Sequence, residues 1–109
     1  MCVCVIISKT EKGEDMKHYI LAKFKDRSDT ERLFPEIKAL FERTLETEGV
    51  EKVEVYKTNS SRENRYSIMI EMTLTPQGLE AYDVSAPHKE WKAKYGDKLE
   101  CKAIFDREE

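Results

Sequence analysis

The alternation of two hydrophobic periods along the chain is the feature that most restricts its fold. Two segments have the period of two that is typical of β-strands, in which successive side chains face opposite sides of the sheet. They are residues 17–25 (KHYILAKFK) and 66–74 (YSIMIEMTL). Between them, apolar residues recur at helical spacing at Leu33, Phe34, Ile37, Leu40, Phe41 and Leu45. The pattern therefore predicts strands and helices that pack around one core.

Two more strands are expected at residues 50–57 (VEKVEVYK) and 99–106 (LECKAIFD). Thr75 and Pro76 suit the N-cap and first position of a second helix, which is expected to break near residues 85–87 and resume until Gly96. The order is then β-α-β-β-α-β, in two similar halves. Right-handed crossovers place both helices on one face of a four-stranded antiparallel sheet, which is the ferredoxin-like α+β sandwich.

The first helix has two features that disagree about where it begins. Ser28 and Glu31 have the spacing of a capping box, in which each side chain bonds the backbone N–H of the other residue. Pro35 lacks the N–H that a helix interior uses, so either the helix kinks there or a short turn precedes a helix that starts at Phe34 and Pro35. Gly49 suits the C-terminal end of this helix.

The two faces of the predicted sheet differ in what they meet. Alternation places these side chains under the helices: His18, Ile20, Phe24, Val53, Val55, Ile68, Ile70, Met72, Leu99, Cys101, Ala103 and Phe105. The other face is expected to carry Tyr19, Leu21, Tyr56, Met69 and Ile104 among Glu and Lys residues. A solvated face seldom holds so much adjoining apolar area, so this face predicts a homodimer that packs sheet against sheet.

The totals restrict domain number, partners and location. A chain of 109 residues has room for one domain, expected at residues 16–109, after an N-terminal extension at residues 1–15 that could add an edge strand. Its 19 basic and 22 acidic residues give a net charge of −3, which disfavours nucleic acid as a partner. Because no apolar run is long enough to span a membrane and MCVCVIIS lacks the features of a signal peptide, we expect a cytoplasmic protein without a membrane partner.

Signals for metals and cofactors are weak. Cys2, Cys4 and Cys101 cannot all pair within one chain, and no second cysteine pair or nearby His completes a zinc site, so free thiols are expected. The four glycines do not form a phosphate-loop or dinucleotide motif, and the sequence predicts no cofactor. Arg62 and Arg65 could meet an anionic ligand, although solvated loop charges are the simpler interpretation.

Several segments, in this order, resemble the stress-responsive dimeric A/B barrel (Dabb) family: KHYILAKFK, EGVEKVEVYK, LEAYDVSAPHKEW and IFDRE. The resemblance covers residues 17–109. It implies a homodimer whose two sheets form an α+β barrel, with a small cavity between the helices and the sheet. Some plant members of the family are stress or defence proteins, and at least one type is a cofactor-free polyketide cyclase.

The resemblance also implies a site. In the cyclase branch, a histidine that begins the first strand, with a tyrosine and a histidine on the second helix, line the pocket, and His18, Tyr82 and His88 match these positions. Such residues would supply a base near neutral pH and a phenol that stabilises an enolate, as cyclase- or aldol-type chemistry requires. Ser85 stands where family members commonly have the first histidine of His-Pro-x-His, which alters the rim.

The expected ligand is a small hydrophobic or aromatic molecule, with Trp91, Phe24 and Tyr95 as candidate pocket walls. Two alternatives stay open. In one, the protein is a non-catalytic stress-related or structural dimer whose histidines only pack. In the other, it is a cofactor-independent monooxygenase, because LEAY…PH also resembles the antibiotic-biosynthesis monooxygenase family, which shares this fold.

Overall fold

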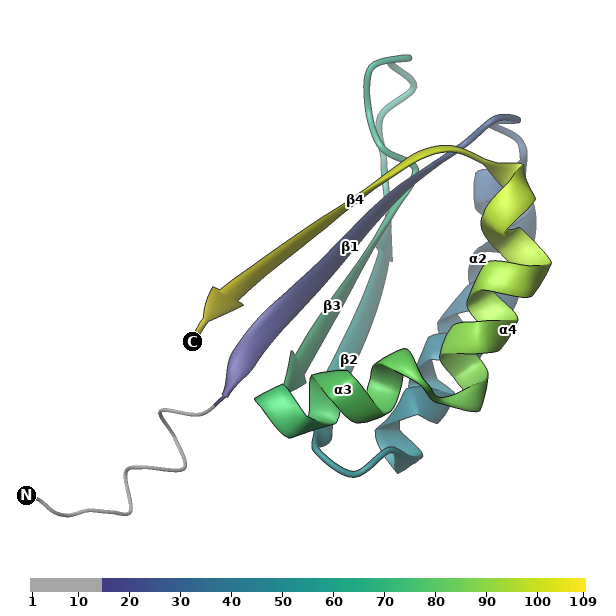
Figure 1. Cartoon of the computed structure of the whole chain (residues 1–109). Coiled ribbons are helices and arrows are strands. Elements are labelled where there is room, and N and C mark those ends of the chain that lie inside the picture. Colours follow the sequence, from purple (N-terminus) through teal and green to yellow (C-terminus); the bar gives the residue numbers. More distant parts are fainter. Residues whose placement is uncertain (1–14) are drawn as a thin grey trace, which may run out of the picture.

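A computed structural model of the chain describes residues 15–109, and its elements follow the expected order (Figure 1). The strands are β1 (Met16–Phe24), β2 (Val50–Lys57), β3 (Ile68–Leu74) and β4 (Leu99–Glu108). The helices are α2 (Asp29–Glu42), α3 (Pro76–Asp83) and α4 (Ala86–Tyr95), with short 3₁₀ turns η2 (Arg43–Glu46) and η3 (Gly96–Lys98). The extension and added strand expected before the domain lie outside the described residues, apart from Asp15.

The strands form one antiparallel sheet in the order β2-β3-β1-β4. All three helices lie on one side of this sheet, and the other side is bare (Figure 1). The ferredoxin-like α+β prediction is confirmed. The core lies between the sheet and the helices, and its largest fully buried side chains are Trp91, Tyr82, Tyr95, Phe24 and Phe41.

Two hydroxyl side chains cap the starts of α3 and α4. Thr75 Oγ1 accepts a hydrogen bond from the Gly78 backbone N–H at 2.9 Å, and Pro76 follows it as the first helical residue. Ser85 Oγ accepts from the His88 N–H at 3.4 Å and caps the start of α4. The predicted N-cap and break are confirmed, and the break turns the chain between residues 82 and 88.

The first helix begins before Phe34, and it lacks the capping box predicted at Ser28 and Glu31. It starts at Asp29 and continues through Pro35, so no separate turn precedes a helix at Phe34. The Ser28 side chain donates to Asp26 Oδ1 at 2.8 Å and makes no cap hydrogen bond, so the capping box is wrong. The nearby Asp26 carboxylate takes the hydroxyl that the cap would have used.

Gly49 does not end α2, because η2 intervenes, but it occupies the turn before β2 with a φ of 94°. That left-handed conformation favours glycine. The turn also lies against Gly78 at the start of α3, where a Cβ would be 2.4 Å from the Gly49 carbonyl oxygen. The two glycines therefore allow the backbone of this turn to touch α3.

A register shift changes the outer strand β4. Phe24 lies opposite Leu99, whereas the preceding residue, Lys23, already lies opposite Cys101. Glu100 is therefore an extra residue in β4, as in a β-bulge. One extra residue exchanges the two faces for the rest of a strand, because successive side chains point to opposite sides.

The predicted faces of β4 are wrong for this reason. Cys101, Ala103 and Phe105, expected under the helices, lie opposite residues 23, 21 and 19 of β1 on the bare face. Ile104, expected on the bare face, lies opposite Ile20 on the helix side. The corrected bare face carries Tyr19, Leu21, Tyr56, Met69, Ala103 and Phe105, which we call the open face.

Candidate functional site

Tyr82 lies at the centre of a group of rings that three elements bring together. Its side chain is 1% exposed. The His18 ring, from β1, lies edge-on to it with ring centroids 5.9 Å apart. The His88 ring, from α4, lies 4.6 Å from it on the same measure. The helix break at Ser85 makes the second contact, because it lets the start of α4 fold back beside the end of α3.

The Tyr82 hydroxyl has no hydrogen-bond partner, the single such buried side-chain atom among residues 15–109. An unsatisfied buried polar group costs about 1–3 kcal/mol. Burial raises the Tyr82 pKa, and the Asp83 charge raises it further. The hydroxyl therefore keeps its proton and stays a hydrogen-bond donor without an acceptor among the described residues.

The hydrogen bond of His88 fixes which of its nitrogens is basic. Its Nδ1 lies 2.9 Å from the Asp83 carbonyl oxygen. Because a carbonyl can only accept, Nδ1 carries the hydrogen in the neutral ring, and Nε2 is left with a lone pair. This is the arrangement in which an imidazole can take up a proton at Nε2.

His18 has a carboxylate partner that sequence reasoning missed. Its Nδ1 lies 2.5 Å from Asp106 Oδ1, and His18 itself is buried. Without the bulge at Glu100, simple alternation would place Asp106 on the bare face. The signal that could have found it is register, since Asp106 lies directly opposite His18 in the β1–β4 pairing. The carboxylate orients the imidazole, as in other His–Asp pairs.

These side chains border a pocket of about 310 Å³ between β1, β4 and the helices α3 and α4. Its apolar lining is Ile20, Leu79, Trp91 and Ile104, and its polar lining is His18, Tyr82, Asp83, His88, Lys102 and Asp106. Ligand pockets in proteins begin at roughly this volume. The pocket is therefore large enough for a small molecule and offers both apolar and proton-transferring groups.

The structure brings together four of the six predicted site residues, namely His18, Tyr82, His88 and Trp91. It places the other two, Phe24 and Tyr95, in the core outside this pocket. Phe24 is six residues along β1 from His18, which is about 20 Å in a strand. Tyr95 is seven residues along α4 from His88, about 10 Å in a helix. Its hydroxyl donates to Glu36 Oε1 at 2.5 Å, and burial, followed by that bond, raises its pKa.

The described part of the chain contains neither a metal-ligand cluster nor a disulfide. Residues 15–109 contain no cluster of three His, Cys, Asp or Glu side chains placed to hold a metal ion. Cys101 is free and exposed on the open face, while Cys2 and Cys4 lie outside the described residues. Within the same residues, no helix is both long and apolar enough to cross a membrane.

No protein-family model and no curated protein matches this chain. Its fold does match solved structures. A dimeric ferredoxin-like protein of unknown function from Bacteroides fragilis NCTC 9343 matches with a TM-score of 0.75 and 17% identity, over 88% of this chain and 97% of that chain. The chain has a ferredoxin-like fold.

Two further structures support the same conclusion. A dimeric ferredoxin-like protein of unknown function from Thermobifida fusca YX has a TM-score of 0.73 and 13% identity, over 89% of this chain and 92% of that chain. A candidate antibiotic biosynthesis monooxygenase from Nitrosomonas europaea has a TM-score of 0.73 and 15% identity, over 89% of this chain and 91% of that chain. At such identities the likeness concerns the fold, and the Dabb assignment stays a prediction.

Proposed function

We propose that this chain is a homodimeric A/B barrel protein of the Dabb type that binds a small aromatic or hydrophobic carbonyl compound. It would catalyse cofactor-free acid–base chemistry on that compound, of the cyclase or aldol type. The observation that carries the proposal is the Tyr82 hydroxyl, which is buried, protonated and unpaired between two histidine rings. A carbonyl oxygen of the ligand would accept the hydrogen bond that the protein leaves unmade.

The apolar lining suits an aromatic ligand. Trp91 and Leu79 come from the helices, and Ile20 and Ile104 from the strands, so a flat ring could enter between the two layers. The Trp91 ring packs edge-on against Phe41, with centroids 5.1 Å apart, which holds this wall in place. A rigid apolar wall with a few polar groups is the usual composition of a small-molecule site.

The chemistry would be a proton transfer followed by carbon–carbon bond formation. His88 Nε2 takes a proton from the carbon next to the ligand carbonyl, and Tyr82 donates a hydrogen bond to the enolate oxygen that forms. The enolate carbon then attacks a second carbonyl carbon of the same molecule. The proton on His88 passes to the new alkoxide, so the step balances without a metal, an oxidant or a cofactor.

His18 and Asp106 would act as positioning residues. The carboxylate fixes the orientation of the His18 ring, and that ring lies edge-on to Tyr82. The oriented His18 ring would in turn restrict the position of the Tyr82 ring. Asp106→Asn would then weaken catalysis without removing a reacting group, and His88→Ala would remove the base itself.

The homodimer is supported by the open face. Phe105 is 59% exposed and Tyr56 is 46% exposed, and the Tyr19 and Phe105 rings lie with centroids 6.2 Å apart. Adjoining apolar side chains of this size are typical of an interface. Two of the structures with the same fold are described as dimeric. Packing open face on open face would close the barrel.

A binding experiment tests the proposal. A panel of aryl ketones, beginning with acetophenone, is titrated by calorimetry into the wild-type protein, Tyr82→Phe and Tyr95→Phe. We expect wild type and Tyr95→Phe to bind equally and Tyr82→Phe to bind about tenfold more weakly, because one buried hydrogen bond is lost. Tyr95 is the matched control, as a buried tyrosine on the same helical region outside the pocket. Equal binding by all three proteins would contradict the proposal.

The same variants separate the two alternatives. Oxygen uptake with quinols that His88→Ala abolishes would replace the cyclase assignment by a cofactor-independent monooxygenase. If no ketone or quinol binds, and His88→Ala changes only stability, the protein is a non-catalytic dimeric module.

A further inference from the structure

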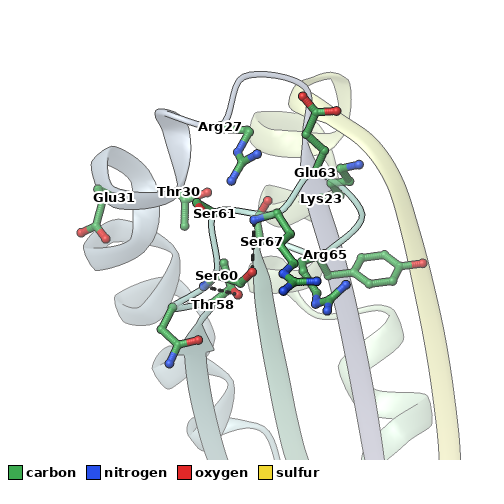
Figure 2. A pocket seen from close by; sticks show the side chains of 13 residues that line it. Lys23, Arg27, Thr30, Glu31, Thr58, Ser60, Ser61, Glu63, Arg65 and Ser67 are labelled. Carbon is green, nitrogen blue, oxygen red and sulfur yellow. Dashed lines mark hydrogen bonds between the residues drawn. The ribbon is translucent and has the colours of Figure 1, made fainter.

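A second pocket, of about 320 Å³, lies at the other end of β1, between the β1–α2 connection and the loop that joins β2 to β3 (Figure 2). It has no lining residue in common with the pocket around Tyr82. We propose that this second pocket, here called the loop pocket, binds the oxyanion group of a small molecule, either a phosphate or a carboxylate. This inference does not depend on the proposed chemistry at Tyr82.

The loop pocket has an excess of positive charge. The loop pocket is lined by four cationic side chains, Lys23, Arg27, Arg62 and Arg65, and by two acidic ones. This concentration of positive charge occurs in a chain with a net charge of −3. The cations come from two segments that are far apart in the sequence, the end of β1 with the β1–α2 connection and the β2–β3 loop, so the fold brings them together. A concave site lined by one sign of charge attracts ligands of the opposite sign.

Most of these cations have no carboxylate partner. Among residues 15–109, Arg27, Arg62 and Arg65 form no ion pair, and Arg65 instead donates to the Asn64 side-chain oxygen at 2.5 Å. Lys23 is the exception, 3.5 Å from Glu100. Three guanidinium groups are therefore available to an incoming anion.

One of the two acids of the loop pocket is already paired with a cation outside it. Glu31 Oε1 lies 2.7 Å from Lys57 Nζ, and Lys57 is not part of the lining. The other acid is Glu63, whose carboxylate lies away from the Ser60 hydroxyl in Figure 2. Arg27, in contrast, points into the space between Thr30 and the β2–β3 loop (Figure 2).

Three hydroxyl side chains add hydrogen-bond donors to the loop pocket. Thr58 Oγ1 accepts the Ser60 N–H at 3.1 Å, and Ser60 Oγ accepts the Arg62 N–H at 3.1 Å. Ser67 Oγ accepts the Phe24 N–H at 3.1 Å. Because each oxygen is held by a backbone donor, each hydroxyl keeps its own hydrogen to donate. Fixed donors beside free guanidinium groups form a surface complementary to an oxyanion.

The geometry of arginine narrows the ligand class. A guanidinium presents parallel N–H groups that match the two oxygens of a carboxylate or phosphate. The loop pocket also adjoins the N-terminal turn of α2, where Thr30 lies and the helix dipole favours negative charge. A compact polyanion, which can reach several of these groups at once, suits it better than a single-charged ion.

The test is a pair of titrations followed by NMR. The ¹⁵N-labelled full chain is titrated with sodium pyrophosphate and, separately, with citrate, at constant ionic strength. We expect saturable shifts in the backbone amides of Thr30, Ser60 and Ser61, with no shift at His88. The anion that binds more tightly identifies the group as phosphate or carboxylate.

Variants supply the controls. We expect Arg27→Gln and Arg62→Gln each to weaken binding about fivefold, as an exposed charge pair would, and the double variant to abolish saturation. Arg43→Gln is the matched control, because Arg43 is a surface arginine 2.9 Å from Glu90 and outside the loop pocket. Shifts that rise without saturation, or equal weakening by Arg43→Gln, would overturn the proposal.

Discussion

At the scale of single residues, the site depends on a hydroxyl that the fold leaves unpaired. Tyr82 is buried as deeply as any core aromatic, yet its oxygen has no partner. A residue kept only for packing would be as well served by phenylalanine. The two neighbouring histidines are each held by a hydrogen bond. The Asp83 backbone carbonyl bonds His88 Nδ1, and the Asp106 carboxylate bonds His18 Nδ1. Under the proposed function, this Tyr82 hydroxyl is the donor that the ligand carbonyl accepts from.

The first prediction follows from this unpaired hydroxyl. Tyr82→Phe should leave the free energy of unfolding unchanged or raise it by about 1 kcal/mol, because it removes an unsatisfied buried group. Tyr95→Phe should lower it by about 1 kcal/mol, since the hydrogen bond to Glu36 is lost. Urea denaturation measures both. If Tyr82→Phe destabilised the protein more than Tyr95→Phe did, the hydroxyl would have a structural partner and its proposed role would fail.

The second prediction concerns alkaline pH. Burial raises the pKa of Tyr82 in the folded chain above its ordinary value of 10.0. Above about pH 10 the unfolded chain therefore loses this proton while the folded chain retains it, and the free energy of unfolding falls as pH rises. Below that pH the contribution is fully present. Urea denaturation between pH 9 and 11 should give a shallower decline for Tyr82→Phe than for wild type, and equal slopes would refute this.

The residues of the site were only partly predictable. His18, Tyr82, His88 and Trp91 fall on periodic segments, so their approach follows from the order of the elements. Asp106 could not be assigned, because its face depends on the extra residue Glu100. Sequence periodicity also does not distinguish a side chain that lines a pocket from one that fills the core on the same helix face. Tyr95 shares a face with His88 and Trp91 but lies in the core.

At the scale of elements, boundaries with chemical signals were predicted well and one strand face was not. The N-caps Thr75 and Ser85 fix the starts of α3 and α4, because a hydroxyl that accepts a backbone N–H leaves a readable pattern. A bulge leaves no such pattern, since one extra residue looks like ordinary strand. The capping box at Ser28 predicts the observed start of α2 at Asp29, but its side-chain hydrogen bond is absent, and the Ser28 hydroxyl donates to Asp26 instead.

The third prediction is at this scale and concerns the contact between the turn before β2 and α3. Gly78→Ala would place a Cβ 2.4 Å from the Gly49 carbonyl oxygen, which is backbone and cannot swing away. We expect a loss of about 1–3 kcal/mol in the free energy of unfolding, as for other overpacked sites. Gly96→Ala is the control, because a Cβ there would meet nothing within 4 Å. Similar denaturation midpoints for the two variants would show that the contact is not needed.

At the scale of the whole molecule, the helices cover one side of the sheet and leave the open face bare, which is the surface that the proposed homodimer would cover. A small domain buries a limited share of its surface, so a partner subunit would add to its stability. The bulge in β4 determines which side chains of this strand lie on each side of the sheet. It sends Phe105 to the open face and Asp106 to the pocket, and thereby connects the proposed interface to the proposed site through adjacent residues.

The fourth prediction concerns assembly. Phe105→Glu should convert a dimer to a monomer in sedimentation velocity, because a charge would be buried at the interface. Val84→Glu is the control, since Val84 is 69% exposed and belongs to the helix side. A wild-type protein that sediments as a monomer at 100 µM, or equal dissociation of both variants, would rule out the open face as the interface.

The most direct test of the central claim is enolisation itself, because it does not require the natural product to be known. Proton NMR in D₂O follows the exchange of the methyl protons of acetophenone and larger aryl methyl ketones. We expect the wild-type protein to accelerate this exchange. His88→Ala and Tyr82→Phe should reduce the acceleration by about 100-fold or more, and Tyr95→Phe should retain it. Exchange no faster than in buffer with free imidazole, or full activity in His88→Ala, would contradict the central claim.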